Sequence, residues 1–119
     1  GLIEAAAAMD LRRLPELFCG FRRARGVGPT LYPVACAPQA WAAAAPFGLA
    51  AAALGLSIDA AQGTVRLERP TLPDRMEELR ISHLRVGEGT VSLRIGRAAG
   101  TVSVDVPERD GAVRVDVML

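Results

Sequence analysis

Two neighbouring segments, Thr90-Val-Ser-Leu-Arg-Ile-Gly96 and Thr101-Val-Ser-Val-Asp-Val106, alternate apolar and polar residues strictly. A period of two places every second side chain on the same face of a β-sheet. The same alternation recurs at residues 65–68 and 113–117, where valine or leucine occupies every second position. The alternation therefore predicts that the second half of the chain forms strands that each bury one face.

Residues 79–86 predict a further strand, but the alternation changes phase at His83 and Leu84, which indicates a β-bulge. Glycine segments separate the runs, and Gly87–Gly89, Glu108–Gly111 and residues 98–100 suit hairpin turns because glycine tolerates positive φ. Together these features predict an antiparallel sheet of about five strands, which is a common sheet size.

The first half of the chain has a helical pattern instead. Residues 1–9 predict an alanine-rich helix, and residues 38–55 predict a second one. Pro38 suits the first turn of that second helix and Gly55 suits its end, whereas Pro46 should kink or split it.

The fold class that follows is α+β, with alanine-rich helices first and the antiparallel sheet second. Residues 20–35 are rich in glycine and proline and predict a long loop, which in a small domain is usually functional or disordered. We expect a helical segment with this loop over residues 1–57 and a β region over 58–119. The apolar face of the sheet should pack on the helices, which gives one compact unit.

Composition narrows the function classes. All 14 basic residues are arginine, they are spread along the chain, and the net charge is +1, which is no footprint for nucleic acid. The two cysteines make no disulfide framework, so we expect a reducing, cytoplasmic setting. Residues 37–56 are uncharged and long enough to span a membrane, but their prolines and the lack of basic flanks favour a buried helix and no membrane partner.

Residues with chemical potential concentrate in Leu14-Pro-Glu-Leu-Phe-Cys-Gly20 and in Tyr32-Pro-Val-Ala-Cys-Ala-Pro-Gln-Ala-Trp41. Between Pro15 and Leu17, the carboxylate of Glu16 would be partly desolvated, which suits a general acid or base. The alternative is a solvated Glu16 in the first turn of a short helix that Pro15 begins, and the residue types alone favour it.

Trp41 is the only tryptophan, and it has two interpretations. A single tryptophan on an alanine-rich helix is usually a core anchor, yet an exposed indole is also a stacking surface for a sugar ring. Gln39, Tyr32 and the arginines at positions 22, 23 and 25 are then possible polar partners, although a solvated loop is the simpler interpretation of the arginines.

The sequence gives little support for thiol catalysis or a metal site. A nucleophilic cysteine needs a histidine or a lowered pKa, and the only histidine, His83, is remote in sequence from Cys19 and Cys36. These three residues also lack zinc-site spacing, so we expect no metal and no cofactor.

The two motif segments resemble bacterial amylo-α-1,6-glucosidases, which are glycogen-debranching enzymes with an (α/α)6 catalytic barrel. Members carry Glu-Ile/Leu-Phe/Tyr-Asp-Gly, then Pro-Arg-Gly-Cys, one residue and Ala-Gln-Ala-Trp, and the match covers about residues 11–56. The resemblance implies that Glu16 is the general base of an inverting hydrolysis and that Gln39 and Trp41 shape a glucose subsite. Cys36 would be structural.

The chain also departs from that pattern. Cys19 stands where the family has an aspartate, and Val34 stands where it has an arginine, which removes two polar sugar contacts. No residue here resembles the family's general acid, and so few helices cannot form a twelve-helix barrel. We therefore expect a C-terminal fragment of a glycosidase that acts on α-1,6 branch points of an α-glucan and is inactive alone.

A second hypothesis is a non-catalytic module that binds carbohydrate or self-associates. Helices without their barrel would expose apolar surface, and such surfaces favour oligomers.

Overall fold

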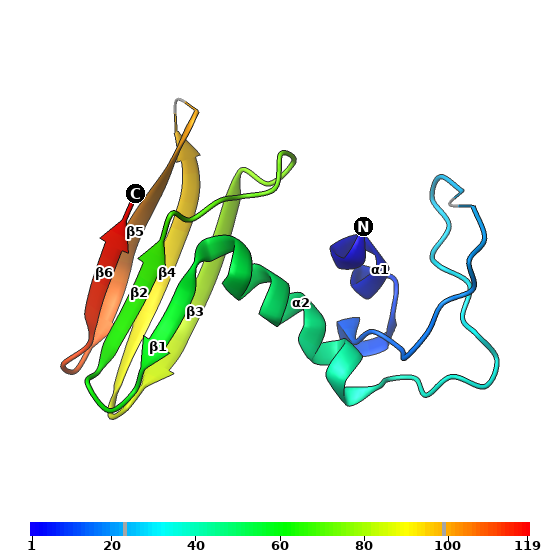
Figure 1. The fold of residues 1–119 in the computed structure, drawn as a ribbon, viewed down its shortest axis with the longest axis horizontal. Helices are drawn as coiled ribbons and strands as arrows, with labels where there is room; N and C mark the ends of the chain where they lie inside the picture. The colour runs from blue at the N-terminus through cyan, green and yellow to red at the C-terminus, as the bar shows by residue number, and fades with distance from the viewer. Residues whose placement is uncertain (23, 99) are drawn as a thin grey trace. The chain divides into compact units, whose positions relative to one another are not determined.

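The computed structural model describes residues 1–22, 24–98 and 100–119. The chain divides into two compact units, Gly1–Leu49 and Ala50–Leu119. The division falls within a helix, before the boundary at residue 57 that the sequence predicts. Figure 1 shows the chain coloured from its N-terminus to its C-terminus.

The Gly1–Leu49 unit contains helix α1 (Leu2–Ala7), a 3₁₀ turn η1 (Asp10–Arg12) and the beginning of helix α2 (Ala40–Leu54). The predicted helix over 1–9 is present but shorter. Its end is set by η1, where Leu11 and Arg12 adopt positive φ values of 52° and 55°.

Helix α2 begins after Pro38, so the prediction that Pro38 lies in its first turn is wrong. Gln39 is the residue that starts the helix, since its carbonyl accepts the amide of Ala43 at 2.8 Å. Pro46 does not split α2, which continues for 15 residues and appears as one coiled ribbon in Figure 1. Gly55 ends it, as predicted, with a φ of 55°.

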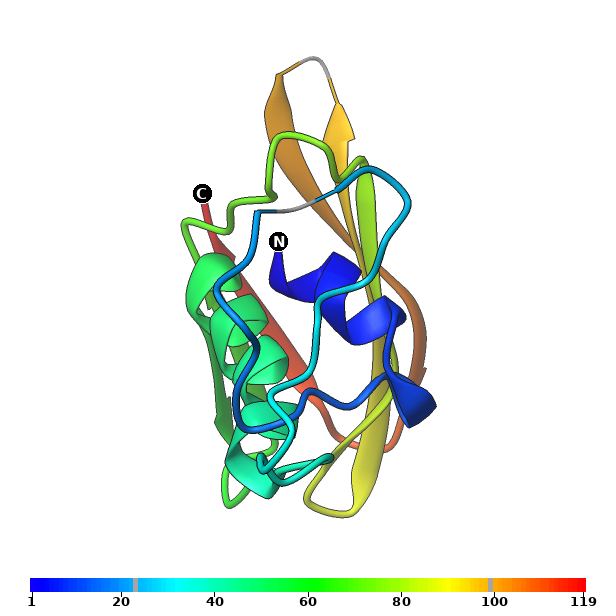
Figure 2. The ribbon, with the colours of Figure 1, turned by 90° about the vertical axis from the view of Figure 1, so that its right-hand side faces the viewer.

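Among the described residues, the Ala50–Leu119 unit contains six strands in two sheets. The first sheet has the order β1-β2-β6, and the second has the order β3-β4-β5. The strands are β1 (Leu56–Asp59), β2 (Thr64–Glu68), β3 (Glu78–Val86), β4 (Gly89–Ala98), β5 (Thr101–Asp110) and β6 (Arg114–Met118). Figures 1 and 2 show the two sheets as separate layers.

The prediction of a single antiparallel sheet of about five strands is therefore wrong, although the α+β class holds. Strand β1 was not predicted, and β2 pairs with β6 in parallel. The reason is physical: a strand in either layer buries one face, so alternation identifies the strands without assigning them to a layer.

The predicted bulge is confirmed. The pairing of β3 with β4 shifts between Ile81 and Leu84, and His83 has a φ of 53°. A second shift between Ser92 and Arg94 places Val106 and Pro107 of β5 opposite Leu93. Proline lacks the ladder donor, so a bulge in an edge strand is where it fits.

The core lies between the two layers. Valine, leucine and isoleucine side chains from both sheets fill it, together with Leu54 from the end of α2. Of the predicted turns, Gly87 and Gly111 adopt positive φ as expected, while the turn at 98–100 includes Ala99, which lies outside the described residues. Gly89 is required by close packing, because a Cβ there would lie 2.6 Å from Cγ2 of Val113.

We predict that Gly55→Ala strongly destabilises the Ala50–Leu119 unit. A Cβ at residue 55 would lie 2.0 Å from the carbonyl oxygen of Glu68, and φ is 55°. We expect a loss of more than about 2 kcal/mol in urea unfolding followed by circular dichroism. Gly48→Ala is the control, because its Cβ meets nothing within 4 Å and alanine favours a helix. Equal stability of Gly55→Ala and wild type would contradict the close approach.

Candidate functional site

The two motif segments lie side by side in the Gly1–Leu49 unit. The amide of Glu16 donates to the carbonyl of Cys36 at 2.9 Å, and the amide of Cys19 donates to that of Thr30 at the same distance. The amide of Gln39 donates to the carbonyl of Leu14 at 3.2 Å. Residues 14–19 and 30–39 thus run antiparallel, and we call this arrangement the motif clamp.

The carboxylate of Glu16 is held by the motif clamp and faces solvent. Its Oε2 accepts the amide of Cys36 at 3.3 Å, so Glu16 and Cys36 are joined by two hydrogen bonds. Leu14 and Pro15 are buried, but Glu16 itself is exposed. The predicted desolvation of Glu16 is therefore wrong. The alternative is right that Glu16 is solvated but wrong in placing it in a helical turn, because residues 13–15 and 17 have no helical structure and residue 16 is a bend.

Of the three predicted sugar-contacting residues, Tyr32 and Gln39 belong to the second segment of the motif clamp and Trp41 follows it, and the three differ in burial. Gln39 is half-buried, and its Oε1 accepts the amide of Ala40 at 3.3 Å, so it caps α2. Trp41 follows in the first turn of α2 and is 71% exposed, which excludes a role as a core anchor in this unit. Tyr32 is 46% exposed.

The other reactive side chains form no catalytic group in the described residues. Cys19 and Cys36 are free thiols, and the Sγ of Cys19 donates to the carbonyl of Leu31 at 3.4 Å. Arg22 and Arg25 are exposed, while Arg23 lies outside the described residues. Over residues 1–22, 24–98 and 100–119, no three histidine, cysteine, aspartate or glutamate side chains could hold a metal ion together.

The Gly1–Leu49 unit exposes most of its large apolar side chains. Only Ala6 and Leu14 are buried among its described hydrophobic residues. Those exposed are Leu2, Ile3, Leu11, Leu17, Phe21, Val27, Leu31, Tyr32, Val34, Trp41, Phe47 and Leu49. Exposed apolar surface on this scale is typical of an interaction surface.

Sequence reasoning missed a polar hollow of about 240 Å³ in the β3-β4-β5 sheet. The buried Ser92 organises it: its hydroxyl accepts the amide of His83 at 3.1 Å and donates to Glu108 at 3.0 Å. The Nε2 of His83 lies 3.9 Å from the same carboxylate. The change of phase at His83 was the signal in the sequence for this hollow. The bulge leaves the amide of His83 without a partner in the ladder, and the hydroxyl of Ser92 takes that place.

The hydroxyl of Ser92 contacts the carboxylate of Glu108 rather than the imidazole of His83, so His83 does not activate the serine.

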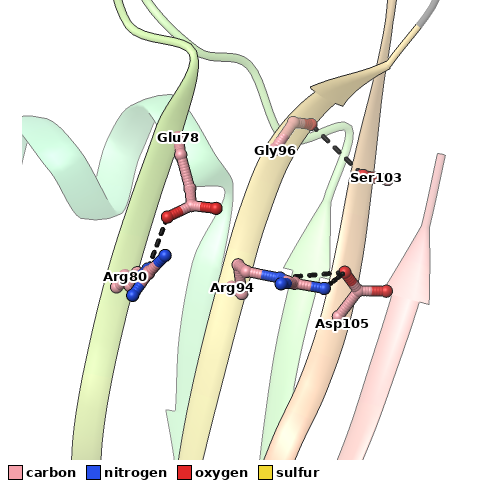
Figure 3. Close-up of polar contacts among 6 residues, drawn as sticks. All are labelled: Glu78, Arg80, Arg94, Gly96, Ser103 and Asp105. Atoms are coloured by element: carbon pink, nitrogen blue, oxygen red, sulfur yellow. Dashed lines mark hydrogen bonds and ion pairs between the residues drawn. The ribbon is translucent and has the colours of Figure 1, made fainter.

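The neighbouring part of this sheet carries exposed ion pairs, which Figure 3 shows: Glu78 pairs with Arg80, and Arg94 contacts Asp105 at 2.8 Å. The hydrogen bond with Asp105, and then its charge, raise the pKa of Arg94 above its usual range. These ion pairs join charged side chains on the surface of the β3-β4-β5 sheet and form no reactive centre.

Comparison with protein-family models, curated proteins and solved structures finds no match to this chain. In the described part of the chain, none of the helices combines the length and apolar character that a membrane crossing requires.

Proposed function

We propose that the chain contributes the general base of a glycoside hydrolase that acts on α-1,6-glucosidic branch points of an α-glucan. One observation carries the proposal: the motif clamp fixes the carboxylate of Glu16 through the amide of Cys36 and leaves it open to solvent. A base that activates water must be both positioned and reachable. The resemblance of the clamp segments to amylo-α-1,6-glucosidases supports the choice of reaction.

In the proposed reaction, Glu16 removes a proton from water as the water attacks the anomeric carbon. A second carboxylic acid protonates the departing glycosidic oxygen, and inverting enzymes place the two groups roughly 6.5–9.5 Å apart. We assign that acid to another part of the enzyme, so the 119-residue chain alone should release no glucose.

The exposed aromatic residues support a sugar as the ligand. The indole of Trp41 offers an apolar face, and Tyr32 adds a ring with a hydroxyl group. Gln39 uses its carbonyl oxygen to cap α2, which leaves the two amide donors of its side chain for sugar hydroxyls.

We predict that Glu16→Gln in the full-length gene product lowers kcat for an α-1,6-linked glucan by about 10²- to 10⁴-fold. Glutamine retains an oxygen for the amide of Cys36, so the motif clamp and KM should change little. Glu88→Gln, at an exposed turn, is the matched control and should retain full activity. Glu16→Gln with wild-type turnover would refute the assignment of the base.

Trp41 allows a direct binding test, because it is the only tryptophan in the chain. We expect titration with isomaltose or a branched dextrin to shift its emission to shorter wavelength as the exposed indole becomes covered. Trp41→Ala should weaken binding by about tenfold in calorimetry, whereas Phe47→Ala on the same helix should not. Unchanged emission at saturating sugar would contradict a sugar subsite.

The exposed apolar residues of the Gly1–Leu49 unit favour a second function, a non-catalytic module that assembles with further copies of itself. This candidate predicts that the emission of Trp41 changes with protein concentration and does not respond to sugar.

A further inference from the structure

Among the described residues, the Ala50–Leu119 unit has four edge strands, and three of them are protected against pairing with other chains. Strand β1 has only four residues, β3 is interrupted by the bulge at His83, and β5 contains Pro107 within its bulge. Short edges, bulges and proline all discourage the addition of another strand. Strand β6 has none of these features and keeps a continuous register with β2.

The backbone groups of β6 divide between a paired side and a free side. The amide of Arg114 donates to Gly63 at 2.8 Å, and the carbonyl of Met118 accepts Arg69 at 2.7 Å, so both residues face β2. Successive peptide groups of a parallel-paired strand alternate in direction. The amides and carbonyls of Val115 and Val117 therefore point away from β2, toward the edge that no described strand covers.

The side chains of β6 complement a second β6 in one antiparallel register. A two-fold axis at Val115 places Arg114 opposite the partner's Asp116, and Val117 opposite the partner's Val113. Opposite charges across strands stabilise such a pair. Axes at Arg114 or Asp116 would place like charges opposite each other, and axes at Val113 or Val117 would not bring Arg114 opposite Asp116. An axis between residues would put polar side chains on the core face.

We propose that β6 is a dimerisation edge at which a second copy of this chain adds its own β6, antiparallel and centred on Val115. The two β1-β2-β6 sheets then form one continuous six-stranded sheet. Pairing satisfies the outward peptide groups of Val115 and Val117, and it covers Val117, which is 39% exposed. This surface is independent of Glu16 and the motif clamp.

Val115→Pro tests the edge, because it removes an amide that β2 does not use. Wild type should sediment as a dimer at micromolar concentration, and Val115→Pro as a monomer with native circular dichroism. Ile58→Pro is the control for loss of an outward amide, since Ile58 lies on the opposite edge of the same sheet and its substitution should leave the dimer intact. Val115 also packs against the core, so the Tm of both variants is measured. A monomeric wild type, or equal masses for wild type and Val115→Pro, would overturn the proposal.

Charge reversal tests the register without proline. Asp116→Arg should raise the dimer dissociation constant by about tenfold or more, because two attractive pairs become repulsive. The double variant Arg114→Asp/Asp116→Arg should restore wild-type affinity. Within one chain Arg114 contacts Asp116 at 3.4 Å, and Asp116 also lies opposite Arg66 of β2, so the Tm of each variant must show that folding is retained. Failure of the double variant to restore dimerisation would overturn the proposed register.

Discussion

The paired hydrogen bonds between Glu16 and Cys36 are the contact on which the geometry of the candidate site depends. They join a carboxylate to a segment twenty residues away in sequence, and they continue into the bonds that Gln39 and Cys19 make across the same clamp. Because Gln39 also begins α2, the clamp places the start of that helix, and with it Trp41. The pairing of these two segments thus positions Glu16, Gln39 and the start of the helix that carries Trp41.

The two units are stabilised by different means. The Ala50–Leu119 unit has a core of fully buried side chains from two facing sheets, such as Val65, Leu67 and Ile95. The Gly1–Leu49 unit buries few apolar side chains and depends on backbone pairing. Burial of apolar area is the main favourable term in folding, at about 25 cal/mol per Å². The Gly1–Leu49 unit therefore gains most from contact with a partner surface.

Much of the β region could be predicted because its strands bury one face. Valine and leucine at every second position identify β2, β4, β5 and β6, and the change of phase at His83 identifies the bulge. Strand β1 has only four residues, Leu-Ser-Ile-Asp, which is too short for a period to stand out. The division into two sheets depends on contacts between residues far apart in sequence, and alternation contains no such information.

The sequence indicated which residues form the candidate site, but not how exposed they are or which groups they contact. Apolar neighbours suited a desolvated Glu16, whereas the residue types alone favoured a solvated one; Glu16 is exposed, and the neighbouring Leu17 is 50% exposed. The cap that Gln39 provides was also hidden, because Pro38 appeared to be the better start for α2. The error at Pro38 arises because the pairing of Gln39 with Leu14 overrides the local preference for proline at a helix start.

Amide hydrogen exchange of the 119-residue chain tests the motif clamp most directly. The clamp predicts that the amides of Glu16, Cys19 and Gln39, each a donor across it, exchange far more slowly than random-coil amides. Random-coil exchange at all three positions would contradict it and remove the basis for assigning Glu16 a catalytic role.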